Sequence, residues 1–280
     1  MGQWMSSVRS HRRNLARISY PGTAILGPEY QPSHELIEID VTYRCNLKCI
    51  GCNRSCRQAS DETRLSPAQL GKFIDESITA GRIWKRIRVL GGEPTTHPDI
   101  LQMLGSLVEY KGRYNPEVQL EIVSNGFGEE AGAIISNIPK EVIVTNTHKT
   151  SVTANRFEDF NLAPQDDARH AITDFRNGCW ITEECGLGLT PFGYYHCAVA
   201  GGIDRVVGYD LGLKHLPSTE RDYGAMTHQM RRLCRWCGHF QSGEKVHTRE
   251  RRLISELSYS SSWAEAYEQY KAQKPELDMY

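Results

Sequence analysis

The stretch VTYRCNLKCIGCNRSC, residues 41–56, places four cysteines in one turn directly after an apolar run. Disulfides, a zinc site and an iron–sulfur cluster are the three physical explanations for so many sulfurs. The chain has 9 cysteines in 280 residues, an odd number, and its start lacks the apolar middle of a secretory signal. Metal ligation is therefore the leading interpretation.

Composition limits the class of protein. The chain is 39% hydrophobic, enough for a large core in one domain or in one domain with an appendage. Its net charge of -1 and pI near 6.8 give no general attraction to nucleic acid or to a membrane, so a small ligand is expected. No apolar stretch approaches the roughly 20 residues that span a bilayer. We expect a cytoplasmic protein, although the start, rich in Arg and Ser and without an acid before Glu29, also resembles a transit peptide.

Strand and helix patterns alternate over the first half of the chain. ELIEIDVTY (35–43) and RIRVLGGEP (86–94) are typical of strands, and SPAQLGKFIDESITAG (66–81) between them is typical of a helix. The alternation continues with a helix near 98–111, a strand over 118–127, a short helix near 129–137 and a strand over 140–149. This pattern predicts a parallel sheet or barrel with functional groups at the carboxyl ends of the strands.

The second half has a different character. Residues 155–173 are polar and irregular, and are expected to form a connector or a substrate-facing loop. Residues 185–202 predict a hairpin around Pro191-Phe192-Gly193, which we assign to a different, cysteine-bearing module. Residues 228–252 hold two cysteines among seven Lys and Arg residues. Residues 261–273 predict an amphipathic helix whose aromatic stripe packs against the core.

The first cysteines have a spacing with a chemical meaning. Cys45, Cys49 and Cys52 form C-x3-C-x2-C, which leaves one iron of a four-iron cluster without a protein sulfur and open to a small molecule. These residues resemble the radical S-adenosylmethionine (radical SAM) superfamily, in which SAM chelates the open iron. The resemblance implies an α/β fold, a partial (β/α)6 TIM-like barrel. Cys56 lies outside the motif and is expected to be a buried thiol.

Further residues resemble the SAM-binding motifs of that superfamily. Gly91-Gly92-Glu93-Pro94 resembles its GGEP motif, which implies close backbone approach at the glycines and a contact from Glu93 to the SAM ammonium group. Ser124 and Asn125 end the third predicted strand, and Thr145 ends the fourth, where the resemblance implies contacts to SAM. The superfamily usually has an aromatic residue before the last cysteine, but this chain has Gly51, so the group that packs against adenine stays open.

A second set of cysteines resembles the auxiliary-cluster modules called SPASM and twitch. Cys179, Cys197, Cys234 and Cys237 are the implied ligands of one auxiliary [4Fe-4S] cluster, and zinc is the alternative for the same residues. Cys185 is then the spare thiol, placed to donate a hydrogen atom to a substrate radical or simply to pack. A related pattern would instead use Cys179 and Cys185 as a ligand pair.

The expected organisation has four parts. They are an N-terminal extension (1–34), the radical SAM core (35–175), a small α+β auxiliary-cluster module (176–240) and a C-terminal helical segment (241–280).

The resemblance implies that a reductase or a flavodoxin-type donor supplies one electron, that SAM is cleaved to a 5′-deoxyadenosyl radical, and that this radical removes a substrate hydrogen. If the auxiliary cluster accepts the second electron, the product is oxidised; if a thiol returns a hydrogen atom, the product is an epimer. About 35 residues precede the first strand, which favours a small polar metabolite, such as a sugar or aminocyclitol of natural-product biosynthesis, over a ribosomal peptide that is matured or crosslinked. A non-catalytic iron–sulfur electron carrier is the alternative from another class.

Overall fold

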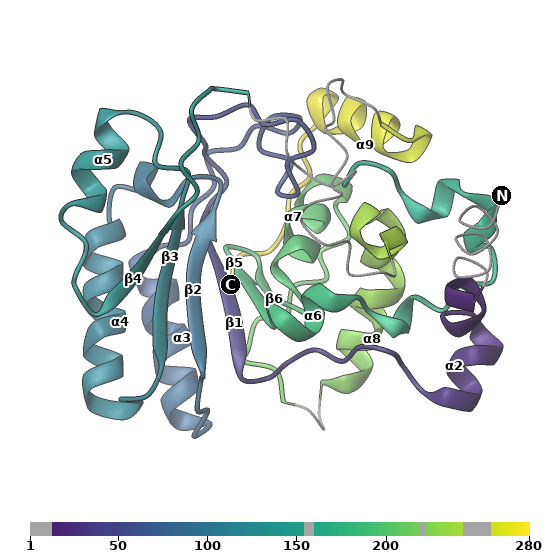
Figure 1. Ribbon diagram of the computed structural model, residues 1–280, viewed down its shortest axis with the longest axis horizontal. Helices are drawn as coiled ribbons and strands as arrows, with labels where there is room; N and C mark the ends of the chain where they lie inside the picture. The colour runs from purple at the N-terminus through teal and green to yellow at the C-terminus, as the bar shows by residue number, and fades with distance from the viewer. Residues whose placement is uncertain (1–12, 154–159, 219–221, 243–258) are drawn as a thin grey trace, which may run out of the picture.

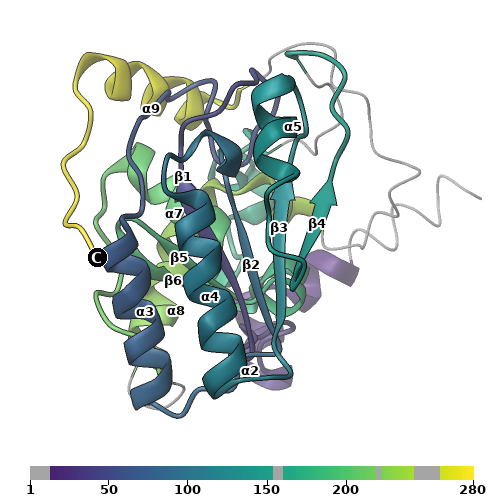
Figure 2. The same cartoon turned by 90° about the vertical axis from the view of Figure 1, so that its left-hand side faces the viewer.

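The computed structural model describes residues 13–153, 160–218, 222–242 and 259–280, and its centre is a six-stranded sheet with the order β4-β3-β2-β1-β5-β6. The first four strands are parallel, and the helices between them cover one face (Figure 1, Figure 2). In chain order these elements are β1 (Leu36–Thr42), α3 (Pro67–Thr79), β2 (Arg86–Gly91), α4 (Ile100–Tyr114), β3 (Gln119–Ser124), α5 (Glu129–Ile135) and β4 (Val142–Asn146). The predicted alternation over residues 35–149 is confirmed.

Strand β1 is buried on both faces. Ile37, Ile39 and Val41 are almost fully buried and belong to the apolar core shared with α3 and α4. Glu38 and Asp40 alternate with them and therefore point to the opposite face, where they are also buried. The sheet thus has an apolar face against the helices and a polar, buried face on the other side.

The predicted hairpin is present, but it lies in the central sheet. Strands β5 (Leu187–Thr190) and β6 (Gly193–Tyr195) pair antiparallel, and β5 also pairs parallel with β1. Our assignment of this hairpin to a different module is wrong in this respect, because β5 is a fifth parallel strand of the central sheet. The mixed α/β sheet is consistent with the expected partial barrel. Gly186 gives the physical reason: a Cβ there would lie 2.1 Å from the carbonyl oxygen of Leu36, so only glycine lets the chain approach β1 so closely.

The C-terminal helices cover the other side of the sheet (Figure 1). They are α6 (Trp180–Glu184), α7 (Ala198–Val207), α8 (Tyr223–Leu233) and α9 (Ser261–Ala272), with the short 3-10 turns η5 (Cys234–Trp236) and η6 (Gly238–Ser242). Before α6, the irregular segment contains the 3-10 turns η2 (Pro164–Asp166), η3 (Ala168–His170) and η4 (Phe175–Asn177). Trp263, Tyr267 and Tyr270 of α9 are buried, so the predicted aromatic stripe does pack against the core.

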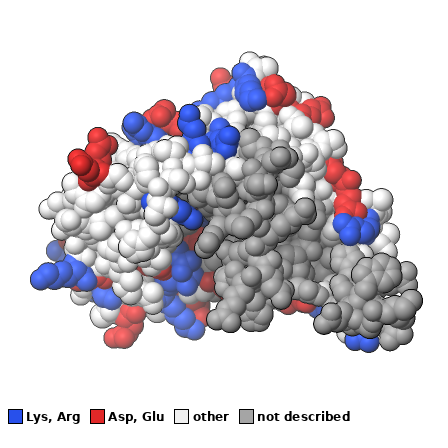
Figure 3. Space-filling model, turned by 45° about the horizontal axis from the view of Figure 1, so that its top comes forward, with Lys and Arg blue, Asp and Glu red and all other residues white. Residues whose placement is uncertain are grey.

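The remaining described elements are α2 (Tyr20–Leu26), in the N-terminal extension, and the 3-10 turn η1 (Pro94–Thr96), after β2. Within the described residues, no helix is both long enough and apolar enough to cross a membrane. Figure 3 shows acidic and basic side chains interspersed over the upper face of the molecule, without a field of one sign. Residues 1–12 of the predicted extension, 154–159 of the predicted loop and 243–258 of the C-terminal part lie outside the described residues. The domain boundaries stay a prediction.

Candidate functional site

The loop after β1 brings the first three cysteines together. Burial raises the pKa of Cys45 to about 12, and the neighbouring sulfurs of Cys52 and Cys49 add to this effect. The three sulfurs therefore lie near one another at the carboxyl end of β1. Gly51 has φ +67°, a backbone conformation that residues with side chains rarely adopt. An aromatic residue at this position would therefore be strained in this loop.

Cys56 is buried, as expected for a thiol outside the motif. The first cause of its raised pKa is a hydrogen bond with Cys52, so it lies beside the motif loop.

The two glycines after β2 lie against the backbone that leads into Cys45. A Cβ on Gly91 would lie 2.3 Å from the carbonyl oxygen of Thr42, and one on Gly92 would lie 2.2 Å from that of Arg44. The Gly92 amide donates a hydrogen bond of 2.7 Å to the Thr42 carbonyl. The close approach implied by the GGEP resemblance is thus an approach to the cysteine loop, which these glycines hold in position.

Glu93 joins the loop after β2 to the end of β3. Its side chain is buried, and its Oε1 accepts hydrogen bonds from the Thr95 amide (3.1 Å), the Thr95 hydroxyl (2.8 Å) and the Ser124 hydroxyl (2.8 Å). Its Oε2 accepts from the Asn125 amide at 2.7 Å. A carboxylate has about four acceptor positions. Glu93 therefore orients both loops, and its direct contact with a SAM ammonium group stays a prediction.

Asn125 extends this connection to the cysteine loop. Its Nδ2 donates to Oδ1 of Asn46 at 2.7 Å, and Asn46 is the neighbour of Cys45. Gly126 has φ +65°, and a Cβ there would lie 2.2 Å from Oδ1 of Asn146. The chain segments at the carboxyl ends of β1, β2, β3 and β4 are therefore in mutual contact.

A row of charged and polar side chains, the charge ladder, crosses the buried polar face of the sheet beside this site. Its members are Glu38, Asp40, Arg54, Arg88, Glu121 and Thr145. Arg54 pairs with Glu38 at 3.0 Å and with Asp40 at 3.2 Å, and all three are nearly fully buried. Burial raises the pKa of Asp40 to about 6, although the guanidinium of Arg54 acts in the opposite direction.

The ladder continues to the far strands through Arg88. This residue pairs with Glu38 at 3.0 Å and with Glu121 at 2.7 Å. The Thr145 hydroxyl donates to Oε1 of Glu121 at 2.6 Å, so Thr145 faces the ladder. Our sequence analysis missed the ladder. Its signal was present, because charges stand two residues apart in β1 and in β2, and β3 carries one charge, Glu121.

Cys185 lies next to the charge ladder. It follows α6 and precedes β5, and burial, followed by the nearby carboxylate of Glu38, raises the pKa of its thiol to about 12. The Cys185 thiol is thus close enough to Glu38 for that carboxylate to act on its pKa. The spare thiol of the sequence analysis therefore lies at the polar face of the sheet.

The four other C-terminal cysteines line one pocket. Cys179, Cys197, Cys234 and Cys237 all belong to its lining, which is otherwise mostly apolar and does not include Cys185. Burial raises the pKa of three of these thiols, those of Cys197, Cys234 and Cys237. Thiolates in such surroundings need a compensating positive charge, which the irons of a cluster provide. Among the described residues, no three Cys, His, Asp or Glu side chains are arranged around a single metal-ion position, and a cluster and zinc both stay predictions for this pocket.

His196 is a further member of this pocket that our sequence analysis missed. Its Nε2 lies 3.3 Å from the Cys234 sulfur, and burial lowers its pKa to about 4. The neutral imidazole can therefore donate a hydrogen bond to the Cys234 sulfur. The only signal in the sequence was its position directly before Cys197.

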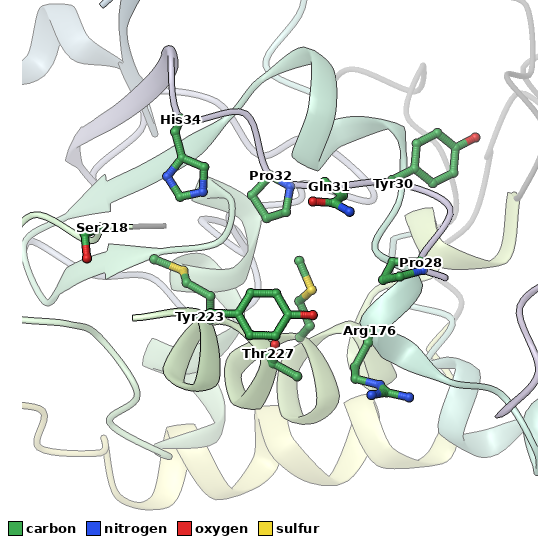
Figure 4. Close-up of a pocket in the computed structure, with 11 residues that line it drawn as sticks. Pro28, Tyr30, Gln31, Pro32, His34, Arg176, Ser218, Tyr223 and Thr227 are labelled. Atoms are coloured by element: carbon green, nitrogen blue, oxygen red, sulfur yellow. The ribbon is translucent and has the colours of Figure 1, made fainter. Parts of the chain in front are cut away.

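A separate pocket lies at the opposite, amino end of β1, between residues 28–34 and α8 (Figure 4). Two prolines, two tyrosines and two methionines make it mostly apolar, and it has a volume of about 140 Å³. None of the cysteines lines it, so we assign it no part in the chemistry.

The comparison with protein families agrees with this site. Residues 39–142 match the model of the Radical SAM superfamily, a range that contains Cys45, Cys49, Cys52 and the Gly91–Glu93 loop. This part of the chain is therefore similar to radical SAM domains, and the SAM-binding [4Fe-4S] cluster and SAM stay the cofactors that this similarity implies.

Several curated proteins are similar to parts of the chain. GTP 3′,8-cyclase of Campylobacter lari is 30% identical over 160 residues, which are 55% of this chain and 44% of that protein. A probable GTP 3′,8-cyclase of Methanococcus vannielii is 30% identical over 69 residues, 25% of this chain and 23% of that protein. Molybdenum cofactor biosynthesis protein 1 of Homo sapiens is 26% identical over 110 residues, 38% of this chain and 16% of that protein. The chain thus spans less than half the length of these relatives.

Two solved structures of BtrN are also similar. The complex of BtrN with AdoMet and 2-DOIA is 13% identical, covers 82% of this chain and 100% of that chain, and gives a TM-score of 0.44. BtrN in an open conformation is 15% identical, covers 82% of this chain and 96% of that chain, and gives a TM-score of 0.38.

Proposed function

We propose that this radical SAM enzyme oxidises a small polar substrate, with SAM bound at a cluster on Cys45, Cys49 and Cys52. In this proposal, an auxiliary [4Fe-4S] cluster on a twitch-like ligand set accepts one electron. The ligands are Cys179, Cys197, Cys234 and Cys237. The observation that carries the proposal is their shared pocket, which leaves Cys185 at the charge ladder.

The residues of the SAM site fit the implied cofactors. The three sulfurs of the motif lie near one another, and Gly91 and Gly92 leave room for the loop that carries them. Glu93 fixes the loop after β2 against the end of β3. When bound, cluster and SAM together supply a 5′-deoxyadenosyl radical, which takes one hydrogen atom from the substrate. The protein's own task is to hold the substrate carbon near this site and to exclude water.

The charge ladder supports a substrate rich in hydroxyl or amino groups. It contains three carboxylates and two guanidinium groups in a buried setting, where polar groups need hydrogen-bond partners. Hydroxyls can donate to its acids and accept from its arginines, and an amine can pair with Glu38 or Glu121. The excess of acids disfavours a nucleoside triphosphate, so we do not transfer the GTP cyclisation of the named relatives to this chain.

The epimerase is the second candidate, because Cys185 lies beside the ladder. There its thiol could return a hydrogen atom to a substrate radical held by Glu38 and Arg88. A redox-neutral epimerisation leaves the product mass unchanged, whereas oxidation removes one hydrogen atom, one proton and one electron. No contact among the described residues specifically supports a peptide substrate.

The test combines product mass with iron content. Anaerobically reconstituted enzyme is incubated with SAM, a reductant and a panel of sugars and aminocyclitols in deuterated buffer. We expect a product two hydrogens lighter, formed equally by Cys185→Ala. A product of unchanged hydrogen count that carries one deuterium, and that the Cys185 variant no longer makes, would establish the epimerase instead. Iron analysis should give about eight irons per chain, and about four when Cys45, Cys49 and Cys52 are replaced by Ala.

A further inference from the structure

One face of α8 and η5 is cationic and points outward. His228, Arg231, Arg232 and Arg235 follow the i, i+3, i+4, i+7 spacing of a single helix side, and all four are exposed. The opposite side is buried and includes Cys234, a member of the four-cysteine pocket. We call Arg231, Arg232 and Arg235 the cationic face.

The cationic face lines a hollow of about 480 Å³ against the segment from Pro164 to Phe175 and against Tyr20. Only one carboxylate belongs to this lining, that of Asp167, and it is already paired with Arg169. Asp174 is near enough to Arg231 for the charge of Arg231 to lower its pKa, but Asp174 is already paired with Arg176. No other described carboxylate lies within ion-pair distance of the three arginines, so the hollow keeps an excess of positive charge.

The end of a solvent-exposed helix does not by itself explain the position of all three arginines. The helix dipole favours cations in the last turn of α8, which accounts for Arg231 and Arg232. Arg235 lies beyond the helix, in η5, between the two pocket cysteines Cys234 and Cys237. A partner bound at Arg235 would therefore sit one residue along the chain from Cys234 and two residues from Cys237, both proposed cluster ligands.

We propose that the cationic face docks an acidic one-electron carrier protein that exchanges electrons with the auxiliary cluster. Charge complementarity selects the partner, because opposite surface charges steer weak electron-transfer encounters and raise their association rates. In turnover, one electron leaves the reduced auxiliary cluster and reduces the oxidised carrier. No bond forms or breaks, and the proton released from the substrate goes to solvent. The electron transfer in this inference rests on the proposed function, because the proposed oxidation supplies the electron. The docking of the carrier does not depend on that function.

The test uses the reconstituted full chain and an acidic flavodoxin as probe. The variant Arg231→Glu/Arg235→Glu reverses two charges and leaves Arg232 in contact with the Tyr209 ring. The matched control, Arg113→Glu/Lys140→Glu, makes the same change in net charge at exposed positions on α4 and before β4. Calorimetry measures flavodoxin binding at several salt concentrations, and stopped-flow absorbance measures electron exchange with the enzyme. Arg231→Gln/Arg235→Gln serves as a second variant, and iron analysis checks that both clusters are loaded.

We expect the charge-reversal variant to bind flavodoxin at least about tenfold more weakly and with less dependence on salt. The Gln variant should lie between it and the native chain, and the control should change binding less than about twofold. Equal losses in the control and in the test variant would overturn the docking surface. Lost binding with an unchanged rate of electron exchange at the auxiliary cluster would overturn its electron-transfer role. An iron content of about four per native chain would instead refute the proposed auxiliary cluster. In that case the binding measurements would still test the docking surface.

Discussion

Replacing Gly92 by Ala tests whether the GGEP-like loop positions the cysteine motif. A Cβ at this position would lie 2.2 Å from the carbonyl oxygen of Arg44, although ordinary van der Waals contacts begin near 3.4 Å. The backbone that leads into Cys45 must therefore move by about 1 Å. Forcing an extra carbon into a packed site costs about 1–3 kcal/mol. For a chain of this size, this corresponds to a Tm lower by roughly 2–5 °C.

The displacement should matter more for the cofactor than for the fold. Because errors of about 1 Å in a reacting geometry can cost about 100-fold in rate, we expect Gly92→Ala to lose most SAM cleavage and part of the iron of the first cluster. The assays are thermal unfolding by circular dichroism, iron analysis after anaerobic reconstitution, and release of 5′-deoxyadenosine. Gly71→Ala in α3 is the control, because a Cβ there meets nothing within 4 Å. This variant should keep full activity, and its free energy of unfolding should rise by about 0.5–1 kcal/mol. Native Tm, iron content and turnover in Gly92→Ala would refute the close-approach argument.

Two further substitutions test the buried carboxylates. Glu93→Gln places an amide donor among the four groups that donate to this carboxylate, so we expect a free energy of unfolding lower by about 1.5–3 kcal/mol and SAM bound at least about tenfold more weakly, measured by calorimetry. Native SAM affinity would remove Glu93 from the site. Asp40 has its pKa raised to about 6 by burial, so between pH 4 and 6 the folded chain binds a proton that the unfolded chain has lost, and this group makes stability fall as pH rises through that window. Asp40→Asn should flatten that part of the stability profile in urea titrations, and an unchanged slope would contradict the raised pKa.

The first four strands and the motif loops could be predicted because their signals are local. Strand and helix patterns alternate along residues 35–149, the three motif cysteines all follow β1, and the glycine pair lies at the end of β2. The pairing of β5 with β1 could not be predicted, because a four-residue strand gives no information about a partner about 150 residues earlier in the chain. The separation of Cys185 from the other four cysteines likewise could not be predicted from the sequence. Spacing alone allowed either Cys179 or Cys185 as a ligand, and only the fold places Cys185 at Glu38.

The two cysteine groups are held together by contacts that neither motif contains. Arg205 of α7, eight residues after Cys197, donates to the Arg54 carbonyl at 2.7 Å and lies 4.3 Å from the centre of the Tyr43 ring. Asn53, directly after Cys52, lies 3.3 Å from Nε2 of His239, which follows Cys237 by two residues. Residues that follow each proposed ligand set in the sequence therefore contact residues beside the other set. Because β5 also joins β1, the second half of the chain cannot be removed without exposing an edge of the sheet that carries Cys45. The cysteine loop after β1 and the four-cysteine pocket are thus tied together by contacts between the two halves of the chain.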